Sequence, residues 1–164
     1  MKIGFDFDRV LFRTDEFNEY IKEQAGLHHV DADIYDSEGC YSPEKHAEAC
    51  GIDVEEVYDA VKGVNRFLYP DIDELRKLKP DHEIVIVTRG EERFQKERVK
   101  ASGANRLFDQ LFIVQNAPKN VDGIDFLVDD REEELERSGL PGIVFDRDES
   151  SLEDVIEKVR SFEA

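Results

Sequence analysis

The stretch Lys2–Asp8, with the sequence KIGFDFD, decides the fold. Its run Lys2–Phe7 has the nearly continuous apolar character of a buried strand, and it ends in two carboxylates, Asp6 and Asp8, separated by one residue. Because side chains alternate along a strand, both carboxylates can point to the same side. The stretch therefore predicts a core strand with paired acidic groups at its end.

Four later runs share this character, which is typical of parallel strands that are covered on both faces. Helical stretches separate the later runs, and such alternation predicts an α/β fold with a doubly wound, Rossmann-like, five-stranded parallel sheet and right-handed crossovers. The predicted strands after the first are Glu83–Val87, Leu111–Val114, Asp125–Val128 and Gly142–Phe145, and the predicted helices are Glu91–Ser102, Arg131–Ser138 and Ser151–Phe162.

One connection is too long for this pattern. About 75 residues separate the first two strands, whereas a crossover needs only a dozen or more. The last part, Asp71–Leu78, is predicted to be the crossover helix. The rest has amphipathic spacing, which disfavours a long disordered loop. We therefore predict a small helical cap at 13–68, inserted into a core of residues 1–12 and 69–164. Its predicted helices are Thr14–Ala25, Pro43–Cys50 and Val54–Phe67.

The charge of the chain narrows the class of partner. The 40 acidic and 22 basic residues give a formal net charge of -18, with 40% hydrophobic residues as in a globular protein. A surface so negative repels phosphate backbones and anionic membranes, so neither a nucleic-acid polymer nor a membrane is expected as a partner. The excess indicates either an adaptation to high salt or an acidic surface with a local cation site, and both interpretations stay open.

The sequence also predicts where the protein acts. No apolar run approaches the roughly 20 residues that a spanning helix needs, and Asp6 interrupts the first run too early for a signal peptide. A soluble, cytoplasmic protein is expected. Cys40 and Cys50 imply no disulfide framework, and their spacing around His46 matches no usual zinc pattern. His28, His29, His46 and His82 are all expected to be solvated.

Polar residues gather where the predicted strands end. The second strand is followed by Thr88, Arg89 and Gly90, and the fourth by Asp129 and Asp130. In open parallel sheets, ligands bind beyond the carboxyl ends of the strands. Carboxylates packed this closely without a cation would have raised pKa values. A hard divalent cation with oxygen ligands resolves the conflict, and Mg²⁺ suits carboxylates together with a substrate phosphate.

The order of these residues resembles the haloacid dehalogenase superfamily. The family's first motif, DxDx[TV][LV], corresponds to Asp6–Leu11, with the sequence DFDRVL. Its second motif, a strand ending in Thr or Ser, corresponds to Ile84–Thr88. Its third is a Lys, and its fourth, an acidic pair after a strand, corresponds to Phe126–Asp130. The resemblance covers nearly the whole chain, and it implies a HAD-like core with a cap between the first two motifs.

The resemblance implies a phosphatase that hydrolyses a small phosphorylated metabolite. Asp6 is then the nucleophile that forms an aspartyl-phosphate, and Asp8 is the general acid and base. Thr88 and Lys119 bind the phosphoryl oxygens. The retained Asp8 favours phosphoryl transfer over dehalogenation, because the family's dehalogenases lack this second carboxylate.

The resemblance also implies a set of ligands for Mg²⁺. Asp6, the backbone carbonyl of Asp8, and Asp129 are the expected ligands, and Asp130 is expected to bind directly or through water. Lys119, ten residues before Asp129, precedes a Leu-Val-Asp-Asp-Arg arrangement similar to that of the deoxyribonucleotidase branch. This likeness points to a nucleoside monophosphate.

Some residues depart from the family pattern or compete for a role. Arg9 stands where many relatives have Gly, and its guanidinium is expected either to reach the substrate phosphate or to point outward. Lys96 and Lys100 compete with Lys119 as the third-motif residue, and Lys119 is preferred because it lies near the strand edge. The candidate substrate-binding residues are Arg9, Arg13, Arg66, Arg89 and Gly90. For Arg13 and Arg66, surface or hinge salt bridges are the alternative.

Three other functions are compatible with parts of this pattern. A phosphoacceptor signalling domain also clusters aspartates, Thr and Lys around magnesium, but there the acidic pair comes first. A non-catalytic relative would keep the fold for binding or regulation. A phosphomutase would use the same residues to return the phosphoryl group to its substrate. The sequence does not indicate the oligomeric state.

Overall fold

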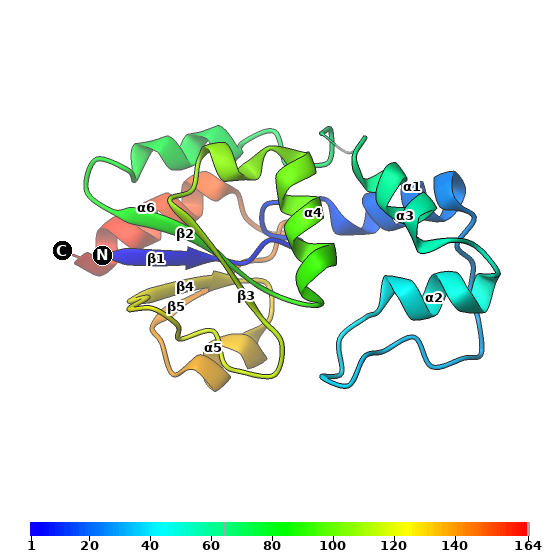
Figure 1. The fold of residues 1–164 in the computed structure, drawn as a ribbon. Helices are drawn as coiled ribbons and strands as arrows, with labels where there is room; N and C mark the ends of the chain where they lie inside the picture. Colours follow the sequence, from blue (N-terminus) through cyan, green and yellow to red (C-terminus); the bar gives the residue numbers. More distant parts are fainter. Residues whose placement is uncertain (64, 164) are drawn as a thin grey trace.

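A computed structural model describes residues 1–63 and 65–163. Val64, inside the predicted helix Val54–Phe67, and Ala164, the last residue of the predicted core, lie outside the described residues. Five parallel strands form one sheet in the order β3-β2-β1-β4-β5 (Figure 1), which confirms the predicted fold class. The strands are β1 (Lys2–Phe5), β2 (Glu83–Arg89), β3 (Gln110–Val114), β4 (Phe126–Asp129) and β5 (Gly142–Val144).

Both faces of the sheet are covered, which explains the nearly continuous apolar runs. Along β2, Ile84 and Ile86 belong to one hydrophobic cluster, and Val85 and Val87 belong to the other. The larger cluster includes side chains of the 3₁₀ helix η1 (Ile72–Lys77), α4 (Glu92–Ser102), η2 (Ala104–Arg106) and α6 (Leu152–Glu163). The smaller one lies against α5 (Glu132–Ser138).

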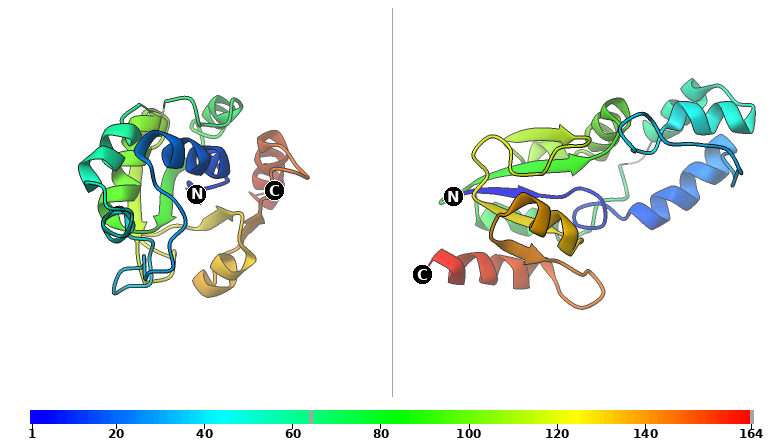
Figure 2. Two further views of the ribbon diagram at one scale, coloured as in Figure 1. Left: turned by 90° about the vertical axis from the view of Figure 1, so that its right-hand side faces the viewer. Right: turned by 90° about the horizontal axis from the view of Figure 1, so that it is seen from below.

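The long connection between β1 and β2 carries three helices beyond the carboxyl ends of the strands (Figures 1 and 2). They are α1 (Thr14–Ala25), α2 (Pro43–Cys50) and α3 (Val54–Val61), and α3 contacts α1, α2 and the core helix α4. The side chain of Ser42 accepts a hydrogen bond from the backbone of Lys45 and so caps α2, while Asp53 caps α3. We call residues 13–68 the insertion.

The helix predicted over Val54–Phe67 ends earlier, at Val61. Residues 62–63 and 65–66 form turns, and beyond them the Arg13 amide donates to the Phe67 carbonyl at 2.6 Å and Leu68 forms an antiparallel bridge with Phe12. These contacts connect the segment where the chain enters the insertion with the segment where it leaves the insertion. They depend on residues far apart in sequence, which a local pattern does not reveal.

The first strand is also shorter than predicted, because it ends at Phe5 and not at Phe7. The Phe7 carbonyl accepts the amides of Leu11 and Phe12, and Arg9 adopts a left-handed backbone with φ of 63°. A side chain in this region costs roughly 1–2 kcal/mol. Glycine adopts this conformation without that cost, so Arg9 is a strained position directly after the first carboxylate pair.

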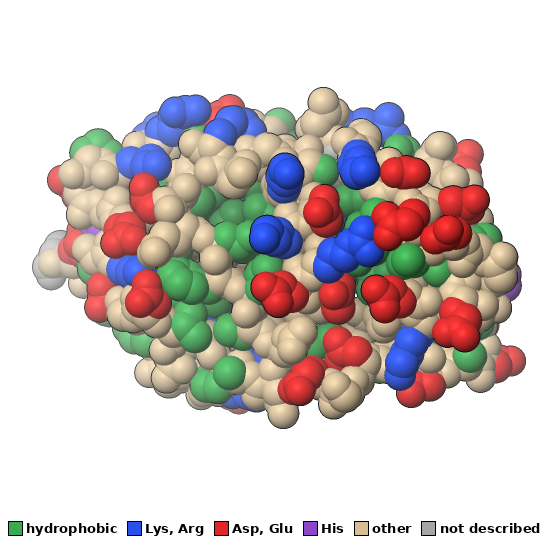
Figure 3. All heavy atoms as spheres, viewed as in Figure 1, with side chains coloured by type: hydrophobic (Ala, Val, Ile, Leu, Met, Phe, Trp, Pro, Cys, Tyr) green, Lys and Arg blue, Asp and Glu red, His purple; other side chains and the backbone are tan. Residues whose placement is uncertain are grey.

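Charges of both signs lie side by side on the face shown in Figure 3, with acidic side chains next to Lys and Arg. Exposed ion pairs occur in the described part of the chain, as in the contact of Arg93 with Glu55 at 2.9 Å. No helix in the described part of the chain is long and apolar enough to cross a membrane. The salt-adaptation hypothesis stays a prediction.

Candidate functional site

Three carboxylates meet at the carboxyl edge of the sheet. Asp6 follows β1, Asp129 ends the neighbouring strand β4, and Asp130 comes directly after it. One oxygen from each lies within 4.8 Å of the others. Asp6 and Asp129 are buried, and Asp130 is half-buried. The arrangement brings together three hard oxygen donors, which is the ligand chemistry that Mg²⁺ prefers.

A buried ammonium partly offsets these charges. Lys119 Nζ lies 3.1 Å from Asp6 Oδ1, 2.6 Å from Asp129 Oδ2 and 3.3 Å from Glu134 Oε2. Burial alone would lower the pKa of Lys119, but the charges of Asp6 and Asp129 raise it above its usual value. Lys119 is therefore a permanent cation here. Lys96 and Lys100, the competing lysines, are exposed on α4.

One ammonium does not balance the cluster. Burial and the charges of Asp129 and Asp8 raise the pKa of Asp6 well above its ordinary value, in spite of the opposing charge of Lys119. Burial and the charge of Asp129 likewise raise the pKa of Asp130. Both shifts reflect carboxylates held together with too little positive charge. A divalent cation bound by Asp6, Asp129 and Asp130 fits this donor set.

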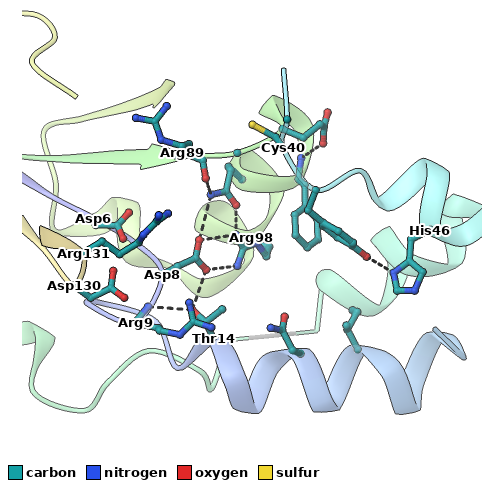
Figure 4. A pocket seen from close by; sticks show the side chains of 18 of the residues that line it. Asp6, Asp8, Arg9, Thr14, Cys40, His46, Arg89, Arg98, Asp130 and Arg131 are labelled. Atoms are coloured by element: carbon teal, nitrogen blue, oxygen red, sulfur yellow. Dashed lines mark hydrogen bonds and ion pairs between the residues drawn. The ribbon is translucent and has the colours of Figure 1, made fainter. Parts of the chain in front are cut away.

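The second carboxylate of the first motif has a different partner. Asp8 accepts hydrogen bonds from Arg98 Nη1 and Nη2, at 2.6 and 3.0 Å, and from the Thr14 hydroxyl at 2.9 Å (Figure 4). Although burial alone would raise the pKa of Asp8, the charge and hydrogen bonds of Arg98 lower it to about 2. Arg98 is itself only 4% exposed. It lies near several aromatic rings, with its guanidinium 4.5 Å from the Phe94 centroid.

Gln95, one turn before Arg98, links Asp8 to the end of β2. Its Nε2 donates to the Thr88 hydroxyl at 2.8 Å and to Asp8 Oδ2 at 3.3 Å. Thr88 is fully buried and is not among the cavity-lining residues in the described part of the chain. A Cβ at Gly90 would lie 2.7 Å from Gln95, so the position needs glycine to keep Gln95 in place. Gly90 itself lines the cavity.

Only two of the four candidate substrate-binding arginines line the cavity in the described part of the chain. Arg89 and Arg9 line the cavity, but Arg89 forms a two-pronged ion pair with Glu134 at 2.8 and 2.9 Å, and Arg9 pairs with Asp15 at 2.8 Å. The structure does not bring Arg13 or Arg66 to the cavity. Arg13 pairs with Glu16 at 3.2 Å, and the Arg66 guanidinium lies over the ring of Tyr20. Arg13 thus forms a salt bridge of the kind that the alternative names, whereas the contact described for Arg66 is with an aromatic ring.

A cavity of about 490 Å³ connects the carboxylates with the insertion. Its size suits a small molecule. His46 lines this cavity, and it is buried and hydrogen-bonded to Tyr41. His82 lies elsewhere, buried beside the amino terminus. The prediction that His46 and His82 are solvated is therefore wrong. Both gain burial from partners distant in sequence, such as the His28 carbonyl at 2.7 Å from His46 Nε2.

The sequence interpretation missed Arg98, Gln95 and Glu134. A signal was present on α4, because Phe94, Gln95 and Arg98 recur at helical spacing with the buried Val99. Because Gln95 and Arg98 are polar, this buried face of the helix does not show the apolar pattern from which buried faces are predicted. Glu134, also buried, lies on α5 where three adjacent glutamates look equivalent in sequence.

The sheet order, the position of the insertion and the carboxylates after β1 and β4 together define a HAD-like α/β fold. No protein-family model matches this sequence, and no curated protein matches it. Several solved structures are similar to it in fold.

A haloacid dehalogenase-like hydrolase from Burkholderia xenovorans is similar, with a TM-score of 0.62 and 16% identity over 82% of this chain and 74% of that chain. A HAD hydrolase from Bacillus subtilis, bound to magnesium, has a TM-score of 0.58 and 11% identity over 86% and 84%. The L-2-haloacid dehalogenase from Xanthobacter autotrophicus has a TM-score of 0.56 and 16% identity over 98% and 82%. At these identities the likeness establishes the fold alone.

Proposed function

We propose that this protein is a magnesium-dependent phosphohydrolase that cleaves a small-molecule phosphomonoester with Asp6 as the nucleophile. One observation carries the proposal. Asp6 is buried at a cavity beside Lys119 and within 4.8 Å of Asp129 and Asp130, while the second carboxylate, Asp8, lines the same cavity. A nucleophile, a fixed cation, a divalent-cation site and a proton carrier are the groups that phosphoryl transfer to a carboxylate requires.

The reaction has two balanced steps. First, a carboxylate oxygen of Asp6 attacks phosphorus, the bond from phosphorus to the ester oxygen breaks, and the departing alkoxide takes a proton from Asp8. Second, water attacks the aspartyl-phosphate and gives a proton to the Asp8 carboxylate. Inorganic phosphate leaves, and both aspartates return to their starting state. The products are one alcohol and one phosphate for each water consumed.

The charges around Asp6 suit this chemistry. Lys119 holds Asp6 by its Oδ1 at 3.1 Å and adds positive charge where phosphoryl oxygens would lie. Asp6, Asp129 and Asp130 would hold Mg²⁺, which supplies positive charge that lets an anionic phosphate approach an anionic carboxylate. Thr88, buried behind its contact with Gln95, would support the site through Gln95.

The contacts of Asp8 add a requirement to the first step. Both Asp8 oxygens accept hydrogen bonds from Arg98, which favours the carboxylate that the second step needs. Proton donation in the first step requires Asp8 to leave this pair. Esters of acidic alcohols, which leave without a proton, should therefore react faster than alkyl esters.

We propose that the insertion at 13–68 acts as a cap that excludes water and admits a small phosphorylated metabolite. A nucleoside monophosphate belongs to this class. The net charge of -18 argues against a nucleic-acid polymer or a membrane as the partner. A cytoplasmic location is part of the proposal.

The test is phosphate release from a panel of small phosphomonoesters, including p-nitrophenyl phosphate, with and without magnesium. The matched variant is Asp6→Asn, which keeps the shape of the side chain. We expect turnover that requires magnesium and falls by a factor of about 10³ or more in Asp6→Asn. Isomerised phosphate esters without phosphate release would indicate a phosphomutase, and halide release from 2-haloacids would indicate a dehalogenase. No turnover of any kind would favour a binding role.

A further inference from the structure

The cavity has an end that the reaction at Asp6 leaves unused. In Figure 4, Asp6, Asp8 and Asp130 lie on one side, and Cys40 and His46 lie on the other. The insertion and the start of α4 supply many of the other lining residues, and several of these side chains are apolar. They include Ile21, Leu27, Tyr41, Val57 and Phe94. We call the part lined by Tyr41 and Phe94 the aromatic end.

The ring of Tyr41 is fixed in place. Its hydroxyl lies 2.6 Å from His46 Nδ1, and His46 Nε2 lies 2.7 Å from the His28 carbonyl oxygen. Since a carbonyl only accepts, Nε2 of His46 carries a hydrogen, and in the tautomer that this selects Nδ1 is the acceptor. The Tyr41 hydroxyl therefore donates to His46, and its one proton is not free for a ligand.

The second ring comes from the core. The Tyr41 and Phe94 centroids are 5.6 Å apart with an interplanar angle of 61°, an edge-to-face arrangement. Phe94 also lies 6.3 Å from Phe17 of α1. The aromatic end is thus built from both parts of the chain, because Tyr41 belongs to the insertion and Phe94 belongs to α4.

Several polar groups near these rings already have partners, although the buried Nε of Arg98, whose guanidinium lies 4.5 Å from the Phe94 centroid, has none. Both nitrogens of His46 are used, and the Glu91 carboxylate accepts the amides of Arg93 and Phe94 and the hydroxyl of Tyr58. A sugar or polyol placed here would leave hydroxyls unpaired, at a cost of roughly 1–3 kcal/mol each. Two further polar side chains of the lining, Asn18 and Lys22, are exposed on α1, and Lys22 pairs with Glu19 at 3.4 Å.

We infer that the aromatic end binds a planar ring carried by the alcohol part of the substrate, so that the substrate class is a phosphomonoester with an aromatic or heteroaromatic leaving group. The statement that the ring is carried by the alcohol part of a phosphomonoester rests on the proposed function. The statement that the aromatic end binds a planar ring does not. A volume of about 490 Å³ accommodates a phosphate and a ring together. Tyr41 and Phe94 are then the residues that determine specificity.

The test is calorimetric binding of two phosphonates that cannot be hydrolysed, with the full chain and magnesium. Benzylphosphonate carries a ring, and 2,3-dihydroxypropylphosphonate carries two hydroxyls. We expect benzylphosphonate to bind about tenfold more tightly. Tyr41→Leu should reduce this preference to about twofold or less, while Tyr41→Phe, which keeps the ring, should retain it. Tyr35→Leu, which removes an exposed tyrosine from the same segment, is the matched control.

Circular dichroism establishes that each variant is folded, and Phe94→Leu replaces Tyr41→Leu if the latter does not fold. Equal binding of the two ligands, tighter binding of the diol, no binding of benzylphosphonate, or an unchanged preference in the leucine variants would each overturn the inference. The preference is measured without turnover, so it is separable from the proposed function. A protein that prefers the ring but releases no phosphate would refute only the latter.

Discussion

The pair formed by Arg98 and Asp8 provides the sharpest test of the site's energetics. Replacing Arg98 by Met keeps an unbranched side chain among the surrounding rings but removes the charge. Asp8, whose side chain is 23% exposed, would lose two hydrogen bonds and its counter-ion. Breaking a buried ion pair by removing one partner costs roughly 3–5 kcal/mol. Because Asp8 retains some solvent, we expect a loss near the lower end, about 3 kcal/mol in the free energy of unfolding.

The pH dependence gives a second measure of the same contact. The pKa of Asp8 lies at about 2, below its ordinary value of 3.8, so ionised Asp8 stabilises the folded state. This contribution is roughly 2 kcal/mol. It is fully present above about pH 4, and it is lost as the pH falls towards 2. The difference between wild type and Arg98→Met should therefore be constant from pH 5 to pH 7 and should shrink by about 1 kcal/mol at pH 3.

Urea unfolding followed by circular dichroism, with a chelator present, measures both quantities. Arg93→Met is the matched control, because Arg93 lies on the same helix but forms an exposed pair with Glu55, which is worth about 0–1 kcal/mol. The double variant Asp8→Asn/Arg98→Met should recover part of the loss. Equal losses in Arg93→Met and Arg98→Met, or a double variant whose loss is the sum of the two single ones, would refute the reasoning.

Three further predictions concern the cation, the sheet and the turn after β2. Lys119→Met should lower stability by about 3 kcal/mol in chelator, and magnesium should raise the melting temperature of this variant more than that of wild type. Gly142→Ala should cost about 3 kcal/mol in urea unfolding, because its Cβ would lie 2.1 Å from the Leu127 carbonyl oxygen and the backbone must move. Gly90→Ala should change stability by less than about 1 kcal/mol, since its Cβ meets the flexible Gln95 side chain. It should nevertheless lower kcat for phosphate release about tenfold, and an unchanged kcat would contradict the role given to Gln95.

The sequence predicted the parts of the site that depend on strand order. Asp6 and Asp129 follow apolar runs, and parallel strands bring their carboxyl ends to one edge. The choice of Lys119 over Lys100 followed from its place near that edge, and its Nζ lies 2.6 Å from Asp129 Oδ2. Strand periodicity therefore predicted the positions of Asp6 and Asp129, whereas Lys119, which lies in a loop, was chosen from the family resemblance and its spacing from Asp129.

The contacts of Asp8 could not be predicted from strand order. The chain leaves the strand before Asp8, next to the left-handed backbone at Arg9, and the partner of Asp8, Arg98, lies 90 residues later in the chain. A charged residue on a helix is most often solvated, so Arg98 carried no distinctive signal. His46 is a similar case, because its burial depends on contacts with Tyr41 and a distant backbone carbonyl.

The charge balance of the site accounts for an apparent conflict between composition and the proposed reaction. A chain of net charge -18 should repel a phosphate dianion, and the site itself has more buried and half-buried carboxylates than cations to pair with them. The carboxylates are Asp6, Asp8, Asp129, Asp130 and Glu134, and the cations that contact them are Lys119, Arg89 and Arg98. The two cationic arginines are held by Asp8 and Glu134, so they are not free to bind phosphate. Arg9 and Arg131 also line the cavity, but each forms an ion pair with an acidic neighbour, Asp15 and Glu133. On the proposed function, a divalent cation between Asp6, Asp129 and Asp130 would supply the added positive charge that favours anion binding.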